Sequence, residues 1–453
     1  MKLIRQVRAL QGDLDSRWDI LFDRQIQAIA PRIEAGPEQE LIDGSSLLLL
    51  SQVIDPHVHF NDPGYTHHED FAHGTRAAAR GGITTVFDMP CTAVPPVTSG
   101  EILEARIRHV ASRAYVDFAF WGGIHAAMCH DEEAVANAIK GMAAAGAIGL
   151  KVYLTSAMPA FPALSVAQLH LVMQLARNHH LRVAVHAEEP TLIQRLEMRA
   201  RNRRLNTPAA YAAHRPALVE ATAIAQVIEV AFDTGAAVHI VHLSSARGLE
   251  LIDRARSEGL DITVETCPHY LAFTAADLDQ IGSALKTAPV VKDAEDREAL
   301  WNGLIDGRID FVATDHASCD FAREKNSGDI WQDYSGMPGV ETMLSYLYEA
   351  GLQKRGLSLK WLQRVTSTAA QRAFKLPLGD LRPGQPATFT LIDSNSPWLV
   401  DPQQFASRGK YSPFAGHTFP ASVKMTFLNG APVFDGVTVA DPPGGSFQAG
   451  GFS

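Results

Sequence analysis

The chain has few cysteines, no long apolar run and no excess of positive charge over its 453 residues. Its four cysteines form no CxxC pair and no disulfide framework, which favours a reducing cytoplasm as its location. No apolar stretch approaches the roughly 20 residues of a membrane span, and the charged first segment lacks a signal-peptide core. The formal net charge of −10 argues against nucleic acid as a partner.

Both ends of the chain resemble short strands separated by turns. The sequence predicts strands at 3–7, 20–22 and 27–29, a buried strand over 46–54, and further strands at 387–393, 421–430 and 431–436. Asn429-Gly430 is a good hairpin turn. We expect the two ends to pair into one small discontinuous domain, residues 1–52 and 378–453, with a Gly/Pro-rich extended arm from Asp441.

The middle of the chain alternates short apolar runs with segments of helical periodicity. Helices are predicted at 165–176, 220–231 and 248–257, and strands at 52–57, 83–89, 115–121, 148–154, 182–186, 237–242, 262–266 and 309–314. Alternating strands and helices predict an α/β fold with a parallel sheet. Eight units are the number that closes a (β/α)8 TIM barrel, here over residues 53–377, and a doubly wound open sheet is the alternative.

Several of these apolar runs contain or end in metal-ligand residue types. They are His57 and His59, Lys151, His186, His242 and Asp315. In a barrel, the carboxyl ends of all strands meet on one face, where active sites lie. Two histidines two residues apart on a strand share a face and can bind one ion.

Each of these residues also has an ordinary structural explanation. The HxH pair could be two solvated loop histidines, a lone His186 or His242 could be a hydrogen-bonded structural residue, and Asp315 could cap a helix. Together they are harder to explain in this way, because burying so many titratable groups without a counter-ion costs free energy. A bound metal ion usually supplies that counter-charge.

Lys151 stands inside an apolar strand, a position that lysine normally avoids. Burial beside a metal would lower its pKa and favour the free amine, since an ammonium group cannot ligate a cation. A free amine can react with carbon dioxide to give a carbamate, an anionic group able to bridge two divalent ions. The alternative is a lysine whose stem is buried and whose ammonium reaches solvent.

The chain resembles the cyclic-amidohydrolase branch of the amidohydrolase superfamily, which contains dihydroorotases, allantoinases and hydantoinases. The motifs that carry the resemblance are DPHVHFNDPG (55–64), GTRAAARGGITTVFDMP (74–90), GLKVYL (149–154), VAVHAE (183–188), HIVHLSSARG (239–248), TCPHY (266–270) and IDFVATDHASC (309–319). The resemblance implies that the domain built from both chain ends is a β-sandwich. It also implies that these proteins form dimers or tetramers, so a homo-oligomer is expected.

The same resemblance implies a pair of divalent metal ions. One would be held by His57, His59 and Asp315, the other by His186 and His242, with carboxylated Lys151 bridging both. Asp315 would also act as general base and acid while a metal-activated hydroxide opens the ring amide. Zinc suits this mixed set of nitrogen and oxygen ligands.

Three further positions indicate which ring the protein binds. Dihydroorotases that resemble this chain usually offer Arg, Asn and His where this sequence has Asn61, Cys91 and Cys319. The loss of an Arg–carboxylate pair disfavours the charged dihydroorotate ring. Allantoinases tend to have Asn or a small polar residue at the first position and Cys at the last.

The sequence therefore predicts a hydrolase that opens a small cyclic amide, with an allantoinase-like reaction from allantoin to allantoate favoured. A dihydroorotase or a related hydrolase is the second hypothesis. A non-catalytic homologue that supports an assembly is the third, although all six ligand positions are filled.

Overall fold

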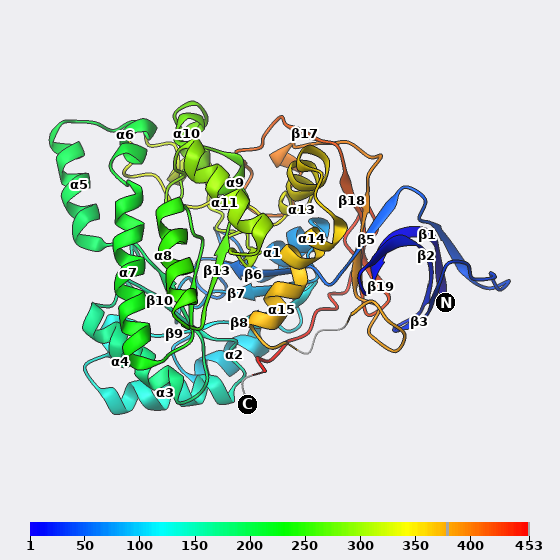
Figure 1. Ribbon diagram of the computed structural model, residues 1–453, viewed down its shortest axis with the longest axis horizontal. Helices are drawn as coiled ribbons and strands as arrows, with labels where there is room; N and C mark the ends of the chain where they lie inside the picture. Colours follow the sequence, from blue (N-terminus) through cyan, green and yellow to red (C-terminus); the bar gives the residue numbers. More distant parts are fainter. Residues whose placement is uncertain (377–379, 452–453) are drawn as a thin grey trace.

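The computed structural model describes residues 1–376 and 380–451. Figure 1 shows a curved sheet at one end of the molecule, which carries the labels β1, β2, β3 and β19. Parallel strands flanked by helices make up the other part. The two regions correspond to the discontinuous domain and the α/β domain that the sequence predicts.

Each of the eight strands predicted for the barrel has a counterpart, and neighbouring strands run parallel. They are β6 (Ile54–Val58), β7 (Thr85–Asp88), β8 (Asp117–Phe120) with β9 (Gly122–Gly123), β10 (Leu150–Tyr153), β11 (Val183–His186), β12 (Val238–Ile240), β13 (Ile262–Thr266) and β14 (Phe311–Val312). Nearly all of their residues are buried, as expected for parallel strands covered on both faces.

Among the described residues, the strand ladders form two sheets rather than one unbroken ring. One contains β6, β7 and β8, and the other runs from β9 to β14. Trp121 separates β8 from β9; β8 lies within the strand predicted at 115–121, and β9 begins just after it. On the other side, a parallel bridge joins Val58 to His316, and the His59 amide donates to the His316 carbonyl at 2.8 Å. The fold is the predicted α/β barrel, and its hydrogen-bond ladder is interrupted between β8 and β9 and between β14 and β6.

Helices follow most of the strands and cover the outside of the barrel. They are α1 (Phe71–Arg80), α2 (Gly100–Val110), α3 (Glu132–Ala144), α4 (Val166–Arg177), α5 (Pro190–Asn202), α6 (Pro208–Ala213), α7 (Ala217–Thr234), α8 (Ala246–Ser257), α9 (Pro268–Ala272), α10 (Ala275–Ile281), α11 (Ala294–Asp306), α12 (Phe321–Glu324), α13 (Met343–Leu347), α14 (Leu359–Gln363) and α15 (Ala369–Ala373). The three predicted helices correspond to α4, α7 and α8. None of the described helices is long and apolar enough to cross a lipid bilayer.

An apolar cluster joins side chains of several barrel strands to the last helices. Phe374 contacts Phe87 and Trp121 edge-to-face, with ring centroids 5.4 and 5.3 Å apart. Phe311 of β14 belongs to the same cluster, and its ring centroid lies 5.8 Å from that of Phe374. Such aromatic burial supplies a large share of core stability, and it supports the strands whose ends carry the polar residues.

Strands from both chain ends form one mostly antiparallel sheet. In spatial order its strands are β19 (Ala431–Phe434), β18 (Ser422–Leu428), β15 (Phe389–Asp393), β5 (Leu47–Ser51), β1 (Lys2–Gln11), β2 (Leu14–Phe22) and β3 (Ile26–Ala30), while β4 (Glu40–Asp43) pairs with β1. The antiparallel pair β5–β15 joins the two ends. Asn429 and Gly430 both have positive φ, as the predicted hairpin turn requires.

The single strand predicted over 46–54 is wrong, because the run is divided between two sheets. Gln52 has a φ of 40°, which breaks the extended backbone after β5. The preceding Ser51 exchanges two hydrogen bonds with the Gln363 side chain of α14. Both halves are apolar because both are buried, so composition alone does not reveal the break.

The domain limits remain predictions, and the second, between 377 and 378, lies outside the described residues.

The Gly/Pro-rich tail lies along the barrel in an extended conformation. The Phe118 amide of β8 donates to the Ser446 carbonyl at 3.0 Å, and the Gln448 amide donates to the Phe118 carbonyl at 2.8 Å. The Phe447 ring packs against that of Phe118 at a centroid distance of 5.9 Å. The tail therefore covers part of β8.

A buried ion pair holds the loop after β6 against the end of β7. Arg106 of α2 pairs with Asp88, and the two side chains are 2% and 0% exposed. Asp88 also accepts a hydrogen bond from the Phe60 amide at 2.9 Å, and Arg106 donates to the Asp62 carbonyl at 3.0 Å. The loop that contains His59 and Asn61 is thus fixed by charge-assisted bonds.

Replacing Arg106 with Met should lower the free energy of unfolding by about 3–5 kcal/mol, because it leaves the Asp88 carboxylate buried without its cation. Arg108→Met is the matched control on the same helix. Arg108 is 71% exposed, so its loss should change stability by about 0.5 kcal/mol or less. Chemical denaturation followed by circular dichroism measures both, and equal stabilities of the two variants would show that the pair does not fix this loop.

Candidate metal centre

Five of the six predicted ligands lie near the carboxyl ends of their strands or within three residues after them, while Lys151 lies near the start of its strand. His57 belongs to β6 and His59 follows it, Lys151 belongs to β10, His186 ends β11, His242 follows β12, and Asp315 follows β14. The side chains of His57 and Asp315 are 1% and 15% exposed. One end of the barrel therefore brings together residues that are far apart in the sequence.

His57, His59 and Asp315 converge on one point. The Asp315 Oδ1 atom lies 3.2 Å from Nε2 of each histidine. One ligand atom from each of the three residues lies within 4.8 Å of the other two. Two imidazole nitrogens and a carboxylate oxygen in this arrangement can coordinate one divalent cation.

His186 and His242 form a second pair beside the first group. Nδ1 of His186 lies 2.9 Å from Nε2 of His242, and the His242 ring centroid lies 5.5 Å from that of His57. Burial and the neighbouring charge of His186 hold the pKa of His242 well below its usual value, so this ring is neutral. A neutral imidazole is the form that binds metals.

Lys151 is the most unusual of the six. Its side chain is completely buried, and its Nζ has no hydrogen-bond partner among the described residues. Burial lowers the pKa of the amine to about 8, although the negative charge of Asp315 opposes the shift. A buried amine without a partner costs free energy, and a lowered pKa increases the share of the neutral amine that can be carboxylated.

The backbone is strained at three of the predicted site residues. Asn61, His242 and Asp315 have φ values of 56°, 41° and 50°. Residues other than glycine adopt this left-handed conformation at a cost of about 1–3 kcal/mol, and such residues gather at functional sites. This signal is invisible in the sequence.

Two buried glutamates support the histidines, and the sequence analysis missed both. Glu265 of β13 lies 2.5 Å from Nδ1 of His57 and 3.2 Å from Nε2 of His239. Burial acts to raise the pKa of Glu265, but the contacts with His57 and His239 together outweigh it and hold the pKa at about 2. A carboxylate on Nδ1 leaves Nε2 of His57 facing Asp315. The charged residue inside the apolar run 262–266 was the available signal.

Glu188 plays the corresponding part for His186. Its Oε2 lies 3.2 Å from His186 Nε2 and 3.2 Å from Nη1 of Arg215. Burial acts to raise the pKa of Glu188, but Arg215 holds it at about 2. The carboxylate therefore stays charged although it is buried. It lies two residues after the VAVH run, in a motif that the sequence analysis used for the family resemblance without giving this residue a role.

Cys91, one of the three predicted substrate residues, contacts a predicted ligand histidine. Its Sγ is 3.8 Å from Nδ1 of His59 and 2.9 Å from the Tyr153 hydroxyl. Tyr153 also stacks on His186 at 5.3 Å between ring centroids. Sequence reasoning gave Tyr153 no role, because a tyrosine in an apolar strand gives no distinctive signal.

Asn61 and Cys319 lie in different surroundings. Asn61 is 1% exposed, and its Nδ2 has no partner among the described residues, so it can donate to a ligand. Cys319 lies 3.4 Å from the Tyr411 hydroxyl, and burial raises the pKa of its thiol to about 11. Cys319 is therefore neutral at physiological pH.

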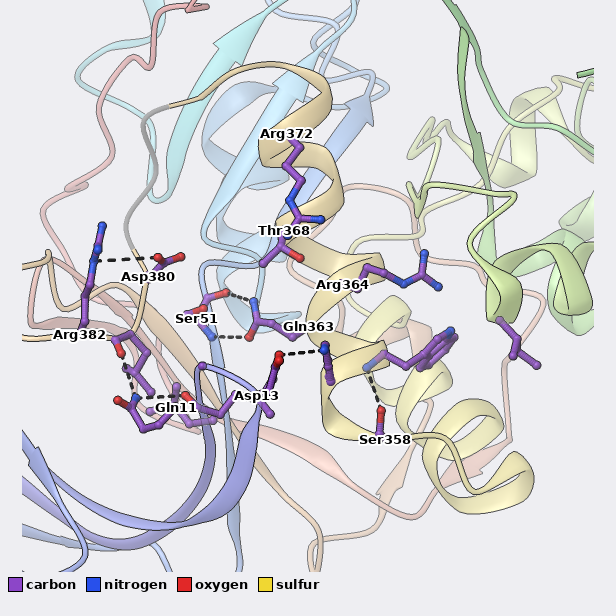
Figure 2. A pocket seen from close by; sticks show the side chains of 17 residues that line it. Gln11, Asp13, Ser51, Ser358, Gln363, Arg364, Thr368, Arg372, Asp380 and Arg382 are labelled. Carbon is purple, nitrogen blue, oxygen red and sulfur yellow. Dashed lines mark hydrogen bonds and ion pairs between the residues drawn. The ribbon is translucent and has the colours of Figure 1, made fainter. Parts of the chain in front are cut away.

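A large cavity lies elsewhere in the molecule. It has a volume of about 640 Å³ and lies between β1 and β5 of the sheet and the helices after β14. Figure 2 shows Asp13, Ser51, Gln363, Arg364 and Arg372 around it. The lining residues include none of the predicted ligands, so cavity size does not identify the metal centre.

A family model named "Amidohydrolase family" matches residues 52–433. An allantoinase of Rubrobacter xylanophilus is 37% identical over 94% of this chain and 92% of the relative. An allantoinase of Deinococcus radiodurans is 35% identical over 91% of this chain and 90% of the relative.

Solved structures with a similar fold come from the same kind of enzyme, the hydantoinases. The L-hydantoinase (dihydropyrimidinase) of Arthrobacter aurescens superimposes with a TM-score of 0.92 at 30% identity, covering 99% of each chain. A D-hydantoinase of a Thermus species has a TM-score of 0.90 at 22% identity, which supports the fold. The family model, the relatives and the fold agree, and the chain belongs to the amidohydrolase family.

Proposed function

We propose that this protein is a metal-dependent hydrolase that opens a small cyclic amide, with allantoin as the favoured substrate. The buried, unpartnered amine of Lys151 beside a group of imidazoles and a carboxylate is the observation that carries the proposal. The relatives named allantoinase, similar over more than nine-tenths of the chain, support the choice of ring.

The proposed centre holds two divalent cations, with zinc suited to the ligand types. His57, His59 and Asp315 would hold one, and His186 and His242 the other. Carboxylated Lys151 would bridge them, which would give its buried nitrogen the partner that the described residues do not supply. Such a pair supplies an acidified water and a Lewis acid for the ring carbonyl.

Asp315 is the proposed proton carrier. Burial acts to raise the pKa of its carboxyl, but the His57 and His59 side chains hold it well below its usual value. A carboxylate in this position can take the proton of the attacking water and pass it to the leaving ring nitrogen. Its Oδ1 lies 3.2 Å from Nε2 of both His57 and His59, so the carboxylate is held beside the imidazoles proposed to share its cation.

The neighbouring side chains favour a neutral ring. Asn61 offers an unpaired amide donor, and the Tyr153 hydroxyl and Cys91 thiol lie beside the histidines. The three predicted substrate positions are an amide and two thiols, so none of them supplies a cation for a carboxylate-bearing ring such as dihydroorotate. A dihydroorotase reaction remains the second candidate, and a non-catalytic assembly role the third.

Glu265→Gln should weaken metal binding by about 10- to 100-fold, because the neutral amide loses the charge that orients His57. Competition with a chromophoric chelator measures the affinity. Glu258→Gln is the control, since Glu258 is exposed and makes a long contact of 3.8 Å to Arg254. Equal affinities in the two variants would remove Glu265 from the proposed centre.

The substrate assignment is tested by measuring steady-state turnover of allantoin, hydantoin, dihydrouracil and dihydroorotate by the metal-loaded protein. We expect the highest kcat/KM for allantoin and loss of turnover after chelation. Turnover of dihydroorotate alone would overturn the choice of ring. Well under one metal ion per chain, with none of the four rings opened, would favour the non-catalytic role.

A further inference from the structure

A second group of metal-ligand side chains lies outside the proposed centre. His67, His68 and Glu324 each offer one ligand atom within 4.8 Å of the other two. Nε2 of His68 lies 2.6 Å from Oε1 of Glu324. We call these three residues the rim cluster. It shares no residue with the proposed centre.

The rim cluster joins two segments that each carry proposed ligands. His67 and His68 lie between β6 and α1, in the segment that begins with His59. Glu324 ends α12, in the segment that follows Asp315. The Ser318 hydroxyl donates to the His68 carbonyl at 2.7 Å, so the two segments already touch. A cation bound here would fasten the segments that flank the metal ligands.

Neighbouring groups already orient two members of the rim cluster. The His68 ring stacks on Tyr65 at a centroid distance of 6.1 Å and lies 5.4 Å from the Tyr334 ring. The second oxygen of Glu324 accepts a hydrogen bond from the Asp320 amide at 2.9 Å. This leaves the first oxygen facing His68. Ligands whose outer contacts are fixed lose less entropy when a metal binds.

We propose that the rim cluster is a third divalent-cation site, suited to Zn²⁺ and separate from the catalytic pair. Two imidazoles and one carboxylate form a ligand set that zinc accepts, with water completing the coordination. His68 and Glu324 are part-buried, with side chains 13% and 30% exposed, and His67 is exposed. The site is therefore open to solvent and exchanges its ion with the medium. It does not depend on which ring the enzyme opens.

His67 distinguishes this site from a simple hydrogen bond. The contact between His68 and Glu324 alone would link the two segments without any metal. The His67 ring lies 4.2 Å from the His68 ring between centroids, yet it is not needed for that link. Removing His67 therefore removes a ligand and leaves the contact between the segments intact.

The test measures metal content of the holoenzyme dialysed against a series of buffered free Zn²⁺ concentrations, with mass-spectrometric detection. The wild-type protein should take up one equivalent per chain more than His67→Ala at saturation. His130→Ala is the control, because His130 is exposed and its Nδ1 lies 2.8 Å from the Ala127 carbonyl, away from the rim cluster in the sequence. It should retain the extra equivalent.

A second readout uses Co²⁺ in place of Zn²⁺. Co²⁺ bound at the rim cluster should add a visible absorption band in wild type and in His130→Ala. In His67→Ala the affinity of the rim cluster for Co²⁺ should fall about tenfold or more. Identical uptake and spectra in all three proteins would overturn the proposal. A failure of the proposed catalytic centre would instead lower the metal content of all three proteins equally, so the two failures can be distinguished.

Discussion

The buried amine of Lys151 is the constraint on which the rest of the site depends. It lies in a strand without exposure to water and without a hydrogen-bond partner among the described residues, close to the charge of Asp315. The described protein groups leave this nitrogen without a hydrogen bond, which costs free energy. A carbamate that binds cations on both sides would remove the cost. In this account, the same change builds the catalytic centre.

The fold provides the fixed positions that such a centre requires. Asp55 of β6 accepts a hydrogen bond from the Thr314 amide at 3.0 Å, which holds β6 against the residue just before Asp315. The Asp88–Arg106 pair fixes the loop after β6. Strain at His242 and Asp315 is tolerated because the surrounding strands determine their backbone. Rigid strand ends thus keep the imidazoles within reach of one carboxylate.

The sequence predicted the strands, and it predicted that His57, His59 and Asp315 lie close together, because the carboxyl ends of parallel strands meet on one face of a barrel. It could not predict the break at Gln52, since both flanking strands are equally apolar. Glu265 and Tyr153 were missed because their roles depend on distances across strands, to His57 and to Cys91. The His67–Glu324 proximity likewise arises only when two distant segments fold together.

The most direct measurement of the central claim is ¹³C NMR of the metal-loaded protein equilibrated with ¹³C-bicarbonate, combined with its metal content. The account predicts a carbamate resonance that is absent from Lys151→Ala. It also predicts that this variant loses the catalytic metals and recovers part of its turnover when short carboxylic acids are added. A free Lys151 amine in a fully active, metal-loaded enzyme would contradict it.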